Sequence, residues 1–243
     1  MNSRHKNLLD QIKEQSGKPT QHTFLDSYLG NTHPRYPINA PTLRGIAKDW
    51  IKSYGNELSV KEFVSLLTSL IEGESATEKT MAGILLDYSP KTLRSFDPTL
   101  FDQWLNHLQG WAEVDSLCTG GYTITEVPAN LAKWKKLLVS FSKSKQIEKR
   151  RASLVLLCSP LSKVKDEKLI AIAFDNISRL KGEKEILITK AISWVLRSAV
   201  KHYKKEVQNF VTLNTNSLPK IAVRETIVKL KTGKKTKSKN TKQ

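Results

Sequence analysis

Two tryptophans and one aspartate stand at spacings that would let them act on a charged ligand. Trp111 and Asp115 are four residues apart. Residues four apart lie on one face of an α-helix, so this ring and this carboxylate would project into one space. Trp194 lies in a second helical segment among three cations at helical spacing, Lys190, Arg197 and Lys201. Flat aromatic rings, a carboxylate and flanking cations are what a site for a positively charged base on a polyanion needs.

The segment around Trp194 has a separate apolar face. This face is formed at helical spacing by Ile188, Ile192, Val195 and Ala199. The pattern predicts a helix that buries this stripe and keeps Trp194 and its cations on an accessible side. Three other tryptophans have no such surroundings and are interpreted as packing residues: Trp50, Trp104 and Trp134.

The chain as a whole reads as helix after helix, and strand-like alternation is almost absent. Ser59 and Glu62 form a capping-box pattern, and Pro98 and Pro219 stand at helix starts. Helices are expected to begin near Ser3, Thr42, Val60, Ala76, Thr99, Trp111, Ala129, Ile147, Asp166, Glu185, Lys204 and Pro219. Short antiparallel pairs of roughly 40 residues predict an all-α protein, a curved α-solenoid of HEAT-like helix pairs.

The charge of the chain favours a polyanionic partner. The net charge is +17, and removing the six lysines of the C-terminal segment leaves +11 on the rest. Such a field favours nucleic acid or an anionic membrane surface. No apolar run approaches the roughly 18 residues of a membrane span. From Lys231 onward large aliphatic, aromatic and acidic residues are missing, which predicts a helical domain over 1–230 and a disordered lysine-rich tail over 231–243.

Cysteine and histidine usage indicates neither a disulfide framework nor a metal site. Cys118 and Cys158 are interpreted as reduced core residues of a cytoplasmic protein, because no signal peptide is visible. The histidines have no metal-like spacing and are interpreted as surface or cap residues: His5, His22, His33, His107 and His202. No metal and no cofactor are expected. When bound to DNA, the protein would be associated with the nucleoid.

Taken in order along the chain, these pieces resemble the AlkD family of alkylpurine DNA glycosylases, which are built from HEAT-like helical repeats. The matching pieces are Tyr28, residues 41–44, 111–115 and 151–152, the helix around Trp194 and Arg197, and residues 219–225. Two departures stand out. Pro37 occupies a position where the family is expected to have glycine, and the loop around Gly182 is a few residues longer.

The resemblance implies an enzyme that hydrolyses the N-glycosidic bond of positively charged N-alkylated purines, such as 3-methyladenine and 7-methylguanine, in duplex DNA. Such a base is already a good leaving group, so the enzyme chiefly needs an anion beside the developing oxocarbenium ion and a positioned water. Asp115 suits that role, while Trp111 and Trp194 suit the cationic base. The family acts without the usual full extrusion of the base. No lysine stands out as a nucleophile, which favours a monofunctional enzyme that leaves an abasic site.

The same resemblance suggests how DNA would be held. Arg151 and Arg197 are interpreted as phosphate clamps, because guanidinium groups bind phosphate bidentately. Further candidates are Arg44, Lys190 and Lys201. Tyr28 either faces the lesion or packs in the first repeat. Groove-reading motifs are missing, so we expect a monomer that binds duplex DNA mainly through phosphates, without a membrane partner.

Two other function classes stay open at this point. One is a non-catalytic HEAT-like DNA-binding module that recognises duplex or damaged DNA by its shape. The other is a protein-binding helical scaffold, which the positive charge disfavours. Taken singly, Asp115 is also compatible with a surface or capping carboxylate, and Trp111 with a core residue. The presence of Trp111, Asp115 and Trp194 together favours the enzyme.

Overall fold

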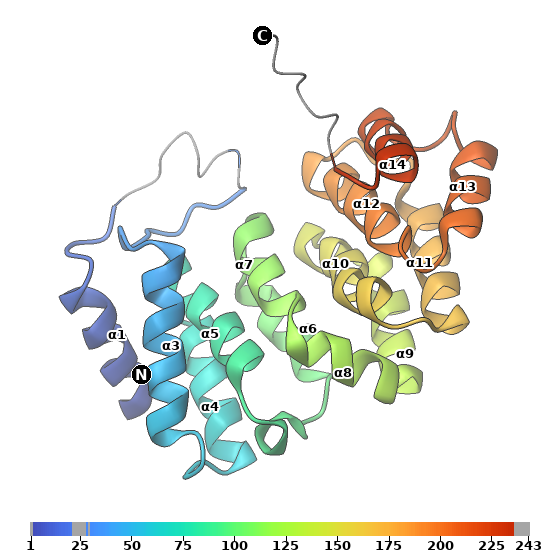
Figure 1. Cartoon of the computed structure of the whole chain (residues 1–243). Coiled ribbons are helices and arrows are strands. Elements are labelled where there is room, and N and C mark those ends of the chain that lie inside the picture. Colours follow the sequence, from blue (N-terminus) through green and yellow to red (C-terminus); the bar gives the residue numbers. More distant parts are fainter. Residues whose placement is uncertain (1, 21–27, 29, 236–243) are drawn as a thin grey trace, which may run out of the picture. The chain divides into compact units, whose positions relative to one another are not determined.

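The structure is a computed structural model that describes residues 2–20, 28 and 30–235 (Figure 1). Regular structure in those residues consists of thirteen α-helices, two short 3-10 helices and one isolated bridge between Thr20 and Arg35. The prediction of an all-α fold is therefore confirmed. The chain divides into two compact units, Met1–Tyr122 and Thr123–Gln243, and each is described by itself.

In the first unit, alternate helices pack side by side. Its helices are α1 (Ser3–Glu14), α3 (Ala40–Tyr54), α4 (Val60–Ile71), α5 (Ala76–Tyr88), α6 (Leu100–Trp104) and α7 (Gly110–Cys118), with 3-10 turns at Lys91–Arg94 and Leu105–His107. Helix α5 contacts α3 on one side and α7 on the other, and these three helices form one layer. Helix α4 packs on α5 and α1 outside that layer. Helix α8 (Gly121–Ala129) begins at the end of this unit.

The second unit repeats this arrangement with longer helices. They are α9 (Leu131–Ser142), α10 (Ile147–Lys163), α11 (Glu167–Leu180), α12 (Ile186–Ala199), α13 (Lys204–Leu213) and α14 (Lys220–Thr232). Helix α12 lies between α10 and α14 in one layer, while α9 and α11 pack on each other and on α10. Contacts between helices one and two apart in sequence are what a stack of helix pairs produces.

Local signals in the sequence explain most helix starts. The Ser59 hydroxyl accepts the Glu62 amide, and the Glu62 carboxylate accepts the Ser59 amide, so the predicted capping box is confirmed. Helix α8 was missed because Gly120 and Gly121 look like a helix stop. Gly120 does end a helix, with φ of +103°, but α8 starts at the very next residue.

The core contains the residues expected there. Trp50, Trp104 and Trp134 are all at most 2% exposed, and Cys118 and Cys158 are buried, as predicted. Helix α14 continues to Thr232, two residues beyond the predicted domain end, and Gly233 caps it with a φ of +69°. Within the described part of the chain, no helix is long and apolar enough to cross a membrane.

Candidate active site

Helix α7 carries the first half of the candidate site. Trp111 and Asp115 lie on successive turns of α7, and both are partly exposed. The neighbours Val114 and Leu117 are buried, at 0% and 1% exposure. The helix therefore turns an apolar side inward and presents an indole and a carboxylate on an accessible side. This arrangement rules out the interpretation of Trp111 as a fully buried core residue.

Close packing against α5 fixes the position of α7. Gly83 of α5 lies so near the Ser116 carbonyl oxygen that a Cβ atom at position 83 would overlap it. The Ser116 hydroxyl also donates to the Thr80 carbonyl at 2.9 Å. Because Ser116 follows Asp115 directly, the glycine contact sets how closely the Asp115 turn of α7 approaches α5.

The turn after α7 is held by the end of α5. The Asp87 carboxylate accepts the Gly121 amide, and it occupies the place that a side chain at Gly120 would need. The Arg94 guanidinium donates to the carbonyls of Asp87 at 2.9 Å and Ser89 at 2.6 Å. A cation on the last carbonyls of a helix stabilises that end. The Arg94 contacts thus hold the end of α5, and Asp87 there holds the turn that follows the helix carrying Asp115.

Helix α12 of the second unit carries a further group of the predicted site residues. The predicted apolar stripe is confirmed, because each of its four residues is fully buried: Ile188, Ile192, Val195 and Ala199. Lys190, Trp194 and Arg197 are partly exposed on another face. Lys201 is exposed but lies beyond the helix, which ends at Ala199, so the predicted continuation of the cationic face along the helix to Lys201 is wrong.

The two predicted arginine clamps have different surroundings. The Arg197 Nε lies 3.2 Å from the Ser193 hydroxyl and 3.3 Å from the Glu225 carboxylate of α14, and its side chain is 15% exposed. Arg151 is only 4% exposed and donates to the carbonyl of Leu187 in the first turn of α12. Arg150, the preceding residue, pairs with Glu183 at 2.8 Å. Arg151 thus ties α10 to α12 within the unit.

The remaining candidates are exposed. Arg44 lies on α3, and Tyr28 is 44% exposed. In the first unit Arg44, Trp111 and Asp115 all belong to the α3–α5–α7 layer. In the second unit the candidates Arg151, Lys190, Trp194 and Arg197 belong to the α10–α12–α14 layer. Within each unit, the helical candidates therefore share a single layer.

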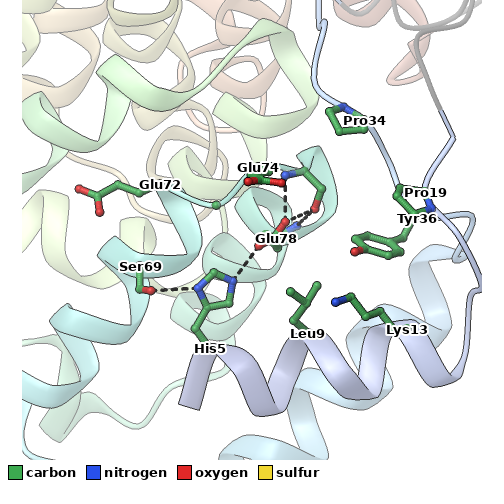
Figure 2. A pocket seen from close by; sticks show the side chains of 12 residues that line it. His5, Leu9, Lys13, Pro19, Pro34, Tyr36, Ser69, Glu72, Glu74 and Glu78 are labelled. Carbon is green, nitrogen blue, oxygen red and sulfur yellow. Dashed lines mark hydrogen bonds and ion pairs between the residues drawn. The ribbon is translucent and has the colours of Figure 1, made fainter. Parts of the chain in front are cut away.

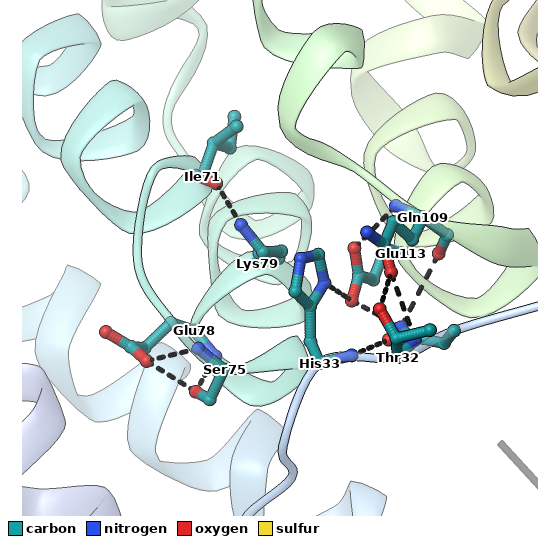
Figure 3. A network of polar contacts seen from close by, with 9 residues as sticks. Thr32, His33, Ile71, Ser75, Glu78, Lys79, Gln109 and Glu113 are labelled. Atoms are coloured by element: carbon teal, nitrogen blue, oxygen red, sulfur yellow. Dashed lines mark hydrogen bonds and ion pairs between the residues drawn. The ribbon is translucent and has the colours of Figure 1, made fainter. Parts of the chain in front are cut away.

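Sequence reasoning missed a buried polar network around Glu113 of α7 (Figure 3). Glu113 is completely buried, and its carboxylate accepts hydrogen bonds from the Asn31 amide, from His33 Nδ1 at 2.9 Å and from the Gln109 amide at 2.8 Å. Lys79 is also buried and donates to the Ile71 carbonyl at 2.6 Å. Burial lowers the pKa of Lys79, and the nearby charge of Glu113 opposes that shift.

A second missed feature is a cavity of about 520 Å³ lined by α1, the loop before α5 and the first turn of α5 (Figure 2). At its wall, His5 contacts the Ser69 hydroxyl at 2.9 Å and the Glu78 carboxylate at 2.8 Å. Burial disfavours the charged form of Glu78, but hydrogen bonds from His5 and Ser75 outweigh it, so the pKa of this carboxyl is lowered. Burial, followed by the charges of Glu78 and Glu74, raises the pKa of Tyr36.

These two features correct the interpretation of the histidines. His5 is buried and His33 is partly buried, and both contact a buried carboxylate because each lies opposite a helix that carries one. His22 lies outside the described residues. Among the described residues, no group of three or more His, Cys, Asp and Glu side chains is placed to hold a metal ion.

The fold and the site define a strongly basic, layered helical protein that displays a tryptophan–carboxylate pair on one helix and a tryptophan among cations on another. The chain belongs to the family of DNA alkylation repair enzymes, whose model matches residues 10–230. The resemblance seen in the sequence is thereby confirmed, and it gives the protein a role in the repair of alkylated DNA.

A solved structure supports the same fold. The chain is similar to a protein described as "Predicted DNA alkylation repair enzyme from Enterococcus faecalis", with 17% identity and a TM-score of 0.67. The match covers 85% of this chain and 95% of that chain. A comparison with curated proteins found no match.

Proposed function

We propose that this protein is a monofunctional DNA glycosylase that excises positively charged N-alkylated purines, such as 3-methyladenine and 7-methylguanine, from duplex DNA and leaves an abasic site. The observation that carries the proposal is the pair on α7, where an accessible carboxylate and an accessible indole lie on successive turns. Membership in the DNA alkylation repair enzyme family supports it.

In this proposal Asp115, Trp111 and Trp194 act on the modified nucleotide. The Asp115 carboxylate stabilises the oxocarbenium ion that develops as the bond to the base breaks, and it orients the attacking water. The indoles of Trp111 and Trp194 contact the cationic base, each contact contributing roughly 0.5–2 kcal/mol. The alkylated base leaves as a neutral molecule, so little acid catalysis is needed.

Phosphate contacts hold the duplex in the same proposal. Arg197 and Lys190 flank Trp194 on α12, and Arg44 lies exposed on the layer that carries Asp115. We assign Tyr28, Lys201 and Arg151 to DNA binding as well. Arg151 would combine this role with its hydrogen bond to the Leu187 carbonyl.

Release of methylpurine from methylated duplex DNA tests the proposal directly. We expect the full-length protein to release base in a single-turnover assay and to leave abasic sites without cutting the strand. Wild-type protein that binds the duplex but releases no base would show instead a non-catalytic DNA-binding module.

Asp115→Asn then tests the assigned chemistry. The amide keeps the size of the side chain but removes its charge, so we expect excision to fall by about 10²–10³. Duplex affinity should hold or rise slightly, because an anion near phosphates is removed. If excision stays unchanged in Asp115→Asn, the protein would still be a glycosylase, but Asp115 would have no part in its mechanism.

A further inference from the structure

We infer that Glu113 is a positioning residue of the proposed site: its buried carboxylate fastens residues 30–33, and with them Tyr28, to the helix that carries Trp111 and Asp115. The inference rests on the proposed function and adds to it a residue that touches neither base nor phosphate. Glu113 lies midway between Trp111 and Asp115 in sequence, but on the buried side of α7.

The contacts of Glu113 run to the segment that follows Tyr28. One carboxylate oxygen accepts from the side chains of Asn31 and His33, and the other accepts from the backbone amide of Gln109. The Asn31 side-chain oxygen in turn accepts the His33 amide at 2.7 Å. Figure 3 shows His33 and Gln109 beside the Glu113 carboxylate. The segment is therefore held by side chains that meet at one carboxylate.

The N-cap residue of α7 also holds the segment that follows Tyr28. Gln109 occupies the N-cap position, yet its side chain makes no capping hydrogen bond to its own helix. Its side-chain oxygen instead accepts from the Thr32 amide at 3.0 Å and from the Thr32 hydroxyl at 2.7 Å. Glutamine is not among the preferred N-cap residues, and here its side chain joins the start of α7 to residue 32 of the segment.

An ionised carboxylate is well suited to this position. Three donors converge on Glu113, and an ionised carboxylate only accepts hydrogen bonds, so all three are satisfied together. A buried negative charge also requires compensation, and the buried ammonium group of Lys79 interacts with it electrostatically. A neutral amide at position 113 would point its own N–H groups at one of these donors.

The short stretch of backbone between Tyr28 and Asn31 links the Glu113 contacts to Tyr28. Three residues of backbone separate Tyr28 from Asn31, and each residue spans at most about 3.6 Å, so the two Cα atoms lie within roughly 11 Å. Tyr28 is 44% exposed, which leaves its ring available to DNA. Fastening Asn31 therefore restricts where Tyr28 can stand relative to the exposed side of α7.

A double-mutant cycle on the full-length protein tests the inference. Tyr28→Ala and Glu113→Gln are combined, and single-turnover excision and duplex affinity are measured for all four proteins on methylated DNA. If Glu113 acts through Tyr28, excision and affinity of the double variant should be no lower than those of the more impaired single variant. The double variant should then exceed the product of the two single effects by at least about threefold. Effects that simply multiply in both readouts would overturn the inference.

Glu78→Gln is the matched control. Glu78 is another buried carboxylate of the same unit that contacts a histidine, and it lies at the cavity beside α1. Its replacement should lower the melting temperature. Its effects on excision and duplex affinity should simply multiply with those of Tyr28→Ala. Coupling of the same size for Glu78 would show a general loss of stability and would also overturn the inference.

A milder variant covers the case in which Glu113→Gln fails to fold. His33→Ala removes one donor and keeps the carboxylate, and the same cycle with Tyr28→Ala should show the same sign of coupling. Failure of the proposed function is recognised separately, because wild-type protein would then release no base. In that case the double-mutant cycle measured by duplex affinity tests the positioning role of Glu113. Wild-type protein that binds no duplex would contradict both the proposed function and the positioning role.

Discussion

At the scale of single residues, the two candidate arginines of the second unit differ in what their removal should disturb. Arg197 is held between Ser193 and Glu225 and keeps part of its side chain exposed. Arg151 is buried and joins α10 to α12. An exposed, oriented guanidinium acts chiefly on a ligand, whereas a buried one also stabilises the fold.

Arg197→Ala should therefore weaken binding to modified and unmodified duplex alike, because the guanidinium is assigned to phosphate and not to the base. Binding should be measured at fixed salt on both duplexes, with Arg151→Ala beside it. Arg151→Ala should lower the melting temperature by more than Arg197→Ala does. A loss of lesion discrimination alone in Arg197→Ala would place its side chain at the base.

The Glu78 carboxylate should make stability depend on acidity. Its pKa is lowered in the folded protein, so it contributes stability that is fully present above its ordinary value of about 4.3 and is lost as pH falls through the lowered folded-state value. Glu78→Gln removes this contribution. In urea unfolding, the difference in unfolding free energy between wild type and variant should narrow below about pH 4. A difference that stays constant down to pH 3 would contradict the lowered pKa.

At the scale of elements, the contact between α5 and α7 is a test of how the site is positioned. Gly83→Ala places a methyl group against the Ser116 carbonyl, so α7 must move. Overpacking of this kind costs about 1–3 kcal/mol of stability, and excision should fall because Asp115 moves with its helix. Unfolding and single-turnover excision provide the two measurements.

Gly45→Ala is the control for this substitution. Gly45 lies within α3, and a Cβ atom there meets open space. Alanine at an unhindered helix position stabilises by about 0.4–1 kcal/mol. Equal stability changes at positions 83 and 45 would mean that α5 and α7 adjust to the added methyl group without strain.

The elements also show how far sequence reasoning reaches. The starts of α1, α4, α5, α10 and α13 fall at the predicted residues, because caps and apolar spacing are local signals. The pairing of Trp111 with Asp115 was predictable for the same reason. The Glu113 network was not, because Asn31 and His33 lie about 80 residues away in sequence and no local pattern records their approach. The burial of Arg151 escaped prediction likewise, since its partner belongs to another helix.

At the scale of the whole molecule, charge should govern binding. The chain carries +17, and among the described residues no group of His, Cys, Asp and Glu side chains is placed to hold a zinc ion. If the protein neutralises Z phosphates, the logarithm of its duplex affinity should fall with the logarithm of salt concentration at a slope of about −0.9Z. Titrations from low to moderate salt measure this slope, and an affinity independent of salt would contradict phosphate-based binding.

The lysine-rich end should add to this attraction without taking part in chemistry. Helix α14 runs to Thr232 and is capped by Gly233, so a truncation that spares the helix begins after Lys235. This truncation should weaken duplex binding and reduce the salt slope, because cations are lost. Excision at saturating protein should be unchanged. A lower excision rate of the truncated protein at saturation would mean that the lysine-rich segment takes part in the proposed active site.

Most helix contacts in both units join neighbours one or two places along the chain, and such short loops close cheaply during folding. The tie between His33 and Glu113 is different, because it spans 80 residues. Closing a loop of that length instead of one of ten residues costs about 2 kcal/mol more entropy. We therefore expect the layers of the first unit to gain most of their contacts before this loop closes. The spacing of the residues thus predicts an order of assembly in which the helices fold first and the segment beside the proposed active site docks last.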